Sequence, residues 1–308
     1  MFRYALRRLI TSVVTLFLVI TLTFFLMQTV PGGPFLGENV NPEITARLLA
    51  KYGYDQPLLT QYVNYLKDLF VGDMGVSMVV KSGEPVTSVI ASHFPISFQI
   101  GMIALLIAVF VGIPLGVFAS MKHGSIFDRV FIFLSSLFVS VPSFIMTIAL
   151  MLIFGVWLKT LPIAYLESWK SYIMPVFGMA IYPMFNLARL TRTTMLDVIG
   201  QDYIKTARAK GLSTFKIMFK HALRNAIIPV VTALGPMIAG ILTGSFVVEK
   251  VFAINGIGKY FISSISARDY PLIMGTTIFL ASFIIIMNLL VDILYKVVDP
   301  RITLGKES

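Results

Sequence analysis

The sequence predicts an all-α membrane protein whose chain crosses the bilayer six times. Of its 308 residues, 57% are hydrophobic and 13% are charged, and the mean hydropathy is +0.85. That is a larger apolar fraction than a water-soluble core of this size would bury. Six long stretches lack Asp, Glu, Lys and Arg altogether, and basic residues gather in alternate connections between them. Composition, these stretches and the placement of basic residues together define a polytopic membrane protein.

The six predicted helices follow from the six uncharged stretches, because a helix needs about 20 apolar residues to cross a bilayer. The spans are expected at residues 9–30, 97–120, 130–157, 172–190, 226–248 and 271–295. The first span follows three arginines, but its apolar run is longer than a signal-peptide core and no small-x-small cleavage site follows it. We therefore expect an uncleaved anchor and a single transmembrane domain over residues 1–308.

Basic residues orient the chain, because Lys and Arg near span ends are enriched on the cytoplasmic side. Three lie at the N-terminus, two in the loop 121–129, eight between 189 and 224, and three after residue 295. Both termini and the loop 191–224 are therefore predicted to be cytoplasmic, and segment 31–95 external. Apolar residues at helical spacing within 59–70 predict a short amphipathic helix in that external segment. The net charge of +10 then reflects topology and attraction to anionic lipid, and nucleic-acid binding is not expected.

Several function classes lack the residues they would need. The chain has no cysteine, which excludes a disulfide scaffold or a thiol nucleophile, and its histidines are too dispersed to suggest a metal site. The segment AINGIGKY has Ala253 and Tyr260 where a phosphate loop needs Gly and Ser or Thr. Neither H-E-x-x-H nor G-x-S-x-G occurs. No enzymatic activity and no cofactor are expected in this chain. The histidines are His93, His123 and His221.

A cationic segment, DYIKTARAKGL at 202–212, stands out in the loop 191–224. Asp202 is a plausible helix N-cap and Gly211 a plausible stop with positive φ, which predicts a helix of about two turns. One face would carry Tyr203, Thr206, Ala207 and Lys210, where the small residues let another surface approach closely. Ser213 is expected to cap a second helix that continues into the fifth span. These cations are also explained by lipid headgroups and topology alone, so composition leaves both interpretations open.

Resemblance to a known family favours the interpretation that this helix contacts another protein. The segment resembles the cytoplasmic signature of membrane subunits of bacterial ABC importers, in which a Gly follows the final Ala by four residues, as Gly211 follows Ala207. The usual Glu of that signature is absent, because Lys205 and Thr206 replace its first two residues. The combination with HALRNAIIPVV is similar to the variant in peptide and nickel permeases. Segments such as YALRRLITSVVTLFLVITLTFFLMQTVPGGPF and VDILYKVVDPR resemble the B-type subunit of oligopeptide permeases.

This resemblance implies a type I ABC importer permease in the bacterial cytoplasmic membrane that forms half of an oligopeptide pathway. Its partners would be a homologous second permease subunit, two ATP-binding subunits that hold ATP and Mg, and an external substrate-binding protein. A dipeptide or nickel permease of the same family, or a secondary transporter, are the alternatives. An intramembrane hydrolase is a further alternative, but it would need a paired nucleophile and base or metal ligands at reacting spacing. The residues implied in contact with an ATP-binding subunit are Tyr203, Thr206, Ala207, Arg208, Ala209, Lys210, Gly211, Leu212 and His221.

Polar residues within the predicted spans are candidates for lining a transport pathway. They are Ser140, Ser143, Asn186, Thr243, Ser245 and Asn288. Asp292 lies inside the sixth predicted span, and acids within spans are functional candidates. Because it lies near the cytoplasmic loop, an ion pair with Arg189 or Arg192 is favoured over a pathway role.

Two glycine patterns predict close helix packing. They are GIPLG at 112–116 and GILTG at 240–244, both of the small-xxx-small type that brings helix backbones together.

Overall fold

The computed structural model describes residues 2–29, 50 and 53–298, apart from the side chains of residues 2–5 and 292–298. Within these residues the chain is helical, with one isolated β-bridge between Val76 and Pro85. It divides into two compact units. One comprises Met1–Ile96 and Asn255–Ile285, and the other Ser97–Ile254 and Ile286–Ser308. The prediction for the external segment before residue 53 lies mostly outside the described residues.

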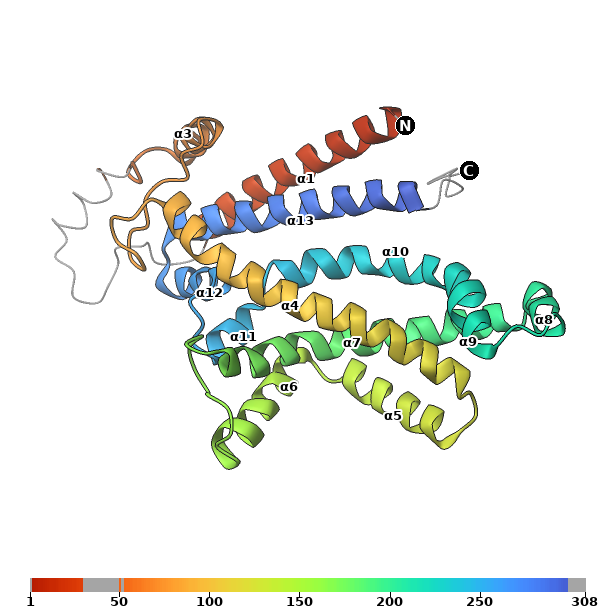
Figure 1. Cartoon of the computed structure of the whole chain (residues 1–308). Helices are drawn as coiled ribbons and strands as arrows, with labels where there is room; N and C mark the ends of the chain where they lie inside the picture. The colour runs from red at the N-terminus through yellow and green to blue at the C-terminus, as the bar shows by residue number, and fades with distance from the viewer. Residues whose placement is uncertain (1, 30–49, 51–52, 299–308) are drawn as a thin grey trace. The chain divides into compact units, whose positions relative to one another are not determined.

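The first unit contains α1 (Phe2–Thr29), α3 (Leu58–Phe70), the start of α4 (Val86–Met121), α12 (Ile257–Ala267) and most of α13 (Tyr270–Val298) (Figure 1). The predicted amphipathic helix within 59–70 is confirmed as α3. It begins after Pro57, whose fixed φ of −55° favours the start of a helix. Its aromatic face packs on α1, where Tyr62 contacts the ring of Phe24.

The second unit is built around α7 (Trp169–Ile199), which has the largest buried share of the candidate spans in the described chain. The C-terminal part of α4, α5 (Ile126–Ser140) and α10 (Leu223–Leu242) pack with it in one apolar cluster. A Cβ added to Gly112 would lie 2.6 Å from the carbonyl oxygen of Met184, and one at Gly116 would collide with the carbonyl of Ala188. The GIPLG prediction is therefore confirmed as close packing of α4 against α7.

The third predicted span, 130–157, is not one straight helix. It consists of α5, α6 (Ser143–Leu150) and the π-helical segment η1 (Met151–Trp157), and α5 is bent by 103° relative to the following pair. Pro142 causes the break, because the residue before a proline avoids helical angles and Val141 is extended at φ −88° and ψ 126°. In the described residues, five helices are long and apolar enough to span a membrane, or six if this pair is one span.

The fifth predicted span, 226–248, also ends differently. Helix α10 stops at Leu242, and a new helix, α11 (Phe246–Val251), starts after Ser245, whose hydroxyl accepts a hydrogen bond from the Val248 amide at 3.3 Å. Gly244 between them has φ +83°, a conformation that stops a helix. The prediction that GILTG brings helices close together is wrong for Gly240, because no atom lies within 4 Å of a Cβ added there.

Candidate coupling segment and transport cavity

The cationic segment forms α8 (Asp202–Ala209), which lies with α9 (Thr214–Lys216) beside the ends of α7 and α10 in the second unit (Figure 1). The N-cap residue is Gln201, so the prediction of Asp202 as N-cap is wrong by one position. Asp202 instead lies in the first turn, where a carboxylate is favoured by the helix dipole. Its carboxylate accepts a hydrogen bond from Lys205 at 2.8 Å, and both side chains are largely exposed.

The C-terminal end of α8 confirms the prediction for Gly211. Its φ is +74°, and its amide donates to the Arg208 carbonyl at 2.9 Å. The amide of the next residue, Leu212, donates to the carbonyl of Ala207 at 3.3 Å, and Leu212 packs on the cluster that contains Ala207. These two hydrogen bonds and the apolar contact define a Schellman motif, which ends helices at a left-handed residue. The direction in which the chain leaves α8 is thereby fixed.

The inner face of α8 belongs to the protein's own core. Ile204 is 0% exposed and Ala207 is 7% exposed, and both pack in a cluster with Met195, Ile217 and other residues of α7 and η2 (Ile217–Ala222). The prediction that Ala207 offers a small surface to another chain is therefore wrong. The predicted residues that remain exposed are Tyr203, Thr206, Arg208, Ala209, Lys210 and Gly211.

The second helix of the segment starts as predicted. The hydroxyl of Ser213 accepts a hydrogen bond from the Lys216 amide at 3.4 Å, and the chain continues through the π-helical η2 into α10. His221 lies on η2 and is half-buried. Asn225 at the start of α10 donates a hydrogen bond to the hydroxyl of Tyr203 at 2.7 Å, which ties α8 to α10.

Phe215 was missed by sequence analysis. Its side chain is 64% exposed on α9, and its ring lies 4.5 Å from that of Phe219. Aromatic side chains with this exposure occur both at protein–protein contacts and at membrane–water interfaces. The available signal was an aromatic residue two positions after the Ser213 cap.

A largely buried ion pair joins α5 to α7. Arg192 donates to both carboxylate oxygens of Asp128, from Nε at 2.6 Å and from a terminal nitrogen at 2.8 Å. Asp128 also accepts from the Gly124 amide at 2.9 Å and contacts His123 at 3.1 Å. The sequence prediction assigned Arg192 to Asp292 instead. The side chain of Asp292 lies outside the described residues, so its pairing, including that with Arg189, stays a prediction.

A cavity of about 670 Å³ lies within the second unit between α6, α7, α10 and α11. Three candidate pathway residues, Ser143, Asn186 and Ser245, line it. Its other walls are mostly apolar and include two prolines, Pro183 and Pro236. The bend before Ser143 and the break before Ser245 bring these residues to the same cavity.

The other three candidates do not line this cavity. The hydroxyl of Thr243 is buried and donates to the Gly240 carbonyl at 3.0 Å. Ser140 is exposed at the end of α5, and Asn288 is exposed on α13. Tyr182, which lines the cavity and is 41% exposed, was not selected from the sequence.

The architecture defines a class: a multi-span helical membrane protein with an ordered helical loop exposed at one end of its bundle. Residues 112–304 match the family described as binding-protein-dependent transport system inner membrane component, and residues 1–101 match the N-terminal region of such components. The chain belongs to this family.

Curated relatives match over almost the whole chain. The dipeptide transport system permease protein DppB of Bacillus subtilis is 46% identical over 100% of both chains. The oligopeptide transport system permease protein OppB of Haemophilus influenzae is 40% identical over 98% of this chain and 99% of its own. A structure of the MetNI methionine ABC transporter in an inward-facing conformation matches with a TM-score of 0.55 at 16% identity, covering 70% of this chain and 99% of that chain. That likeness supports the importer permease fold.

Proposed function

We propose that this chain is the permease subunit of an ATP-driven importer of oligopeptides. It forms half of the translocation pathway with a homologous second subunit, while separate ATP-binding subunits hydrolyse ATP and an external binding protein delivers the peptide. The observation that carries this proposal is the cationic helix α8, held rigidly on the chain's own core with its polar face exposed.

Rigid attachment suits a mechanical connection. Ile204 and Ala207 join α8 to α7 and η2 through a cluster without exposed members, and Asn225 adds a hydrogen bond to α10. A displacement applied to the exposed face of α8 would therefore reach the helices that line the 670 Å³ cavity. The proposed contacts to an ATP-binding subunit are Tyr203, Arg208, Ala209, Lys210 and Phe215.

A dipeptide importer is the second candidate, because the relative that is 46% identical is named for dipeptides. Peptide uptake by complexes reconstituted with all partner subunits in proteoliposomes distinguishes an oligopeptide importer from a dipeptide importer. An oligopeptide permease is expected to accumulate pentapeptides in an ATP-dependent manner, whereas a dipeptide permease accumulates dipeptides alone. Absence of ATP-dependent uptake of either would contradict the proposal.

The proposed orientation has its own test. A single cysteine at Ser82 is expected to react with an impermeant thiol reagent in intact cells, and one at Ser213 is not. The cysteine-free chain makes each label unambiguous. The opposite labelling pattern would place α8 outside and overturn the coupling role.

A further inference from the structure

The connection between η1 and α7 in the second unit carries a group of exposed rings. The chain has two tryptophans, and both lie here, Trp157 at the end of η1 and Trp169 at the start of α7. They are 74% and 72% exposed. Tyr165 between them is exposed too, as are Leu158 and Ile163. Residues 157–169, the aromatic connection, take no part in the proposed pathway or coupling.

The backbone of the aromatic connection is held in place by hydrogen bonds. The amides of Thr160 and Leu161 donate to the carbonyl of Phe154 at 2.9 and 3.2 Å. The amide of Tyr165 donates to the carbonyl of Phe252, at the end of α11, at 3.0 Å. These bonds tie the connection to η1 and to α11. The exposure of its rings is therefore a feature of the folded chain and not the result of a free loop.

Two residues of the aromatic connection adopt a strained backbone. Lys159 and Tyr165 have φ of +53° and +59°, in the left-handed region that residues with a side chain adopt seldom. Ile163 packs so closely on Gly155 that a Cβ added to this glycine would collide with it. Strained conformations persist where the surrounding structure requires them, and they gather at functional segments. The fold thus holds this surface in a defined shape.

The side chains of the aromatic connection match the boundary between membrane and water. Trp and Tyr are enriched there because each ring is apolar and also carries a polar N–H or O–H group. Lys159, Glu167 and Lys170 are exposed beside the rings, and the Lys170 ammonium lies 5.9 Å from the centre of the Trp169 ring. These charges disfavour the hydrocarbon core, whereas the rings disfavour water. The boundary suits both.

The length of α7 places the aromatic connection at the membrane face opposite α8. α7 has 31 residues, which make a helix about 46 Å long, and a bilayer with its headgroup regions is about 40 to 45 Å thick. Trp169 begins α7, and α8 follows the other end of α7, as Figure 1 shows. When α8 lies in the water at one face, Trp169 therefore lies among the headgroups of the other face.

The bend before α6 brings the chain to this boundary. α5 has 15 residues and is therefore about 22 Å long, shorter than the hydrocarbon core of about 30 Å. α6 and η1 then turn by 103° from α5, so they do not continue along its axis. η1 exposes Leu152, Phe154 and Val156. A turned helix with exposed apolar side chains is typical of a segment that lies along the membrane surface.

We propose that the aromatic connection lies in the boundary between lipid headgroups and acyl chains on the membrane face opposite α8. Trp157 and Trp169 are its anchors, and its partner is the lipid bilayer. Anchoring fixes η1 and, through it, α6, which carries Ser143 to the wall of the 670 Å³ cavity. A neighbouring protein subunit is the competing occupant, but the exposed charges beside the rings and the fit of α7 to one bilayer thickness favour lipid.

Tryptophan fluorescence tests this placement in the complete complex, reconstituted into lipid nanodiscs. The lipids carry bromine, which quenches tryptophan on contact, either near the headgroups or near the bilayer centre. The difference in emission between the wild-type complex and Trp157→Phe/Trp169→Phe isolates the two rings, because this chain has no other tryptophan and those of the partners cancel. We expect bromine near the headgroups to remove more of this difference emission than bromine near the centre. The single variants Trp157→Phe and Trp169→Phe give the share of each ring.

A ring expected deep in the membrane provides the matched control. Phe110 lies on α4 in the middle of the second predicted span and is exposed. Phe110→Trp is introduced into the variant Trp157→Phe/Trp169→Phe, so that it supplies the only tryptophan of this chain. Its emission is expected to fall more with bromine near the bilayer centre than with bromine near the headgroups.

Three results would overturn the proposal. Equal or stronger quenching of Trp157 and Trp169 by bromine near the bilayer centre would make the connection part of a span. No quenching by either lipid, with emission at long wavelength, would place the rings in water. No quenching with emission at short wavelength would place them under a neighbouring subunit. Because the fluorescence needs no transport, each of these results contradicts only the lipid contact and leaves the permease assignment untouched.

Discussion

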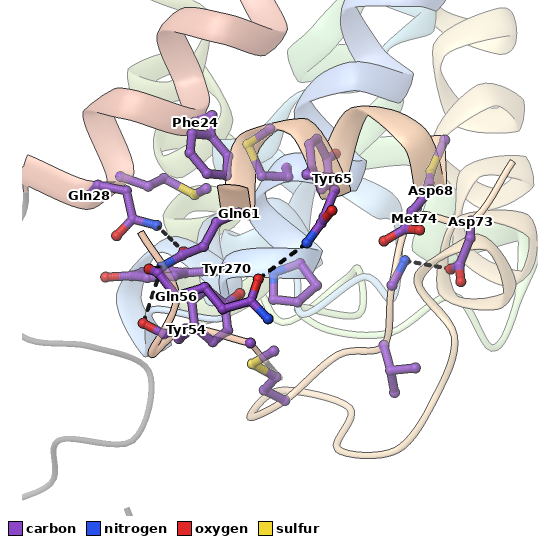
Figure 2. A pocket seen from close by; sticks show the side chains of 18 of the residues that line it. Phe24, Gln28, Tyr54, Gln56, Gln61, Tyr65, Asp68, Asp73, Met74 and Tyr270 are labelled. Atoms are coloured by element: carbon purple, nitrogen blue, oxygen red, sulfur yellow. Dashed lines mark hydrogen bonds between the residues drawn. The ribbon is translucent and has the colours of Figure 1, made fainter. Parts of the chain in front are cut away.

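Helices α8 and α3 are both short and lie outside the predicted spans, yet they are attached in different ways. α8 has two buried side chains in an apolar cluster and a Schellman motif at its end. α3 has no fully buried residue, and it contacts α1 through rings and a hydrogen bond between Thr21 and Tyr62 at 2.6 Å. The difference indicates that α8 moves with its unit as one body. α3 instead rests on α1 through its aromatic face and borders a cavity (Figure 2).

The largest expected effect is at the ion pair that joins α5 to α7 in the unit that carries α8. Asp128→Asn leaves Arg192 without its charged partner, and removing one member of a buried pair costs about 3 to 5 kcal/mol. Asp128 is buried at 2% exposed, and Arg192 is mostly covered at 13% exposed. Thermal unfolding of Asp128→Asn in detergent, monitored by size-exclusion chromatography, is expected to show a large loss of stability. The exposed pair offers the control: Asp202→Asn is expected to leave the unfolding temperature unchanged.

A substitution inside the α8 cluster has the next largest effect. Ala207→Trp overfills a packed site at a cost of about 1 to 3 kcal/mol, and it detaches α8 from η2. The expected result is lower thermal stability even before any partner is present. Ala209→Trp is the matched control, because Ala209 is exposed on the same helix. Equal stability of the two variants would show that α8 is not held by this cluster.

Gly211 has a smaller expected effect on stability. An added Cβ meets no atom within 4 Å, so the cost comes from the left-handed backbone at φ +74°. That conformation costs a residue with a side chain roughly 1 to 2 kcal/mol. Gly211→Val is expected to lower ATP turnover stimulated by peptide while the variant still reaches the membrane. A variant with wild-type coupling would mean that the exit angle of α8 is unimportant.

The smallest effect is expected on α3. Tyr62→Phe removes the hydrogen bond to Thr21 and should cost about 0.5 to 1.5 kcal/mol. Tyr65→Phe removes a hydroxyl that has no partner in the described chain and should cost nothing. The unfolding temperatures of the two variants, measured without peptide, compare these cases. A greater loss for Tyr65→Phe would refute this description of α3.

The sequence was sufficient to place most helices and the stop at Gly211. Long apolar stretches and a single glycine with positive φ are local features, and they leave little choice of structure. The signal for the break at Pro142 was also local. The bend was not predicted because the apolar run 130–157 continues through the proline. The break at Gly244 was hidden in the same way by the apolar residues around it.

The errors in the candidate sites came from tertiary contacts. Helical spacing placed Tyr203 and Ala207 on one face, but it could not show that η2 covers Ala207 while Tyr203 stays exposed. Asp128 was not selected because an acid at the start of a helix needs no partner, and its pairing with Arg192 joins positions 64 residues apart. The prediction of pathway residues failed for a related reason. The hydroxyl of Thr243 donates a hydrogen bond to the carbonyl of Gly240 and does not line the cavity.

The contact of α8 with an ATP-binding subunit is the central claim, and a single cysteine tests it most directly. Ala209→Cys places a thiol on the exposed side of α8 in a chain that has no other cysteine, and Ser82→Cys is the control on the first unit. The complete complex is labelled with a maleimide in detergent, alongside a preparation without the ATP-binding subunits. We predict that these subunits slow the labelling of Ala209→Cys strongly and leave the labelling of Ser82→Cys unchanged. Equal labelling of Ala209→Cys with and without the ATP-binding subunits would contradict the coupling role of α8.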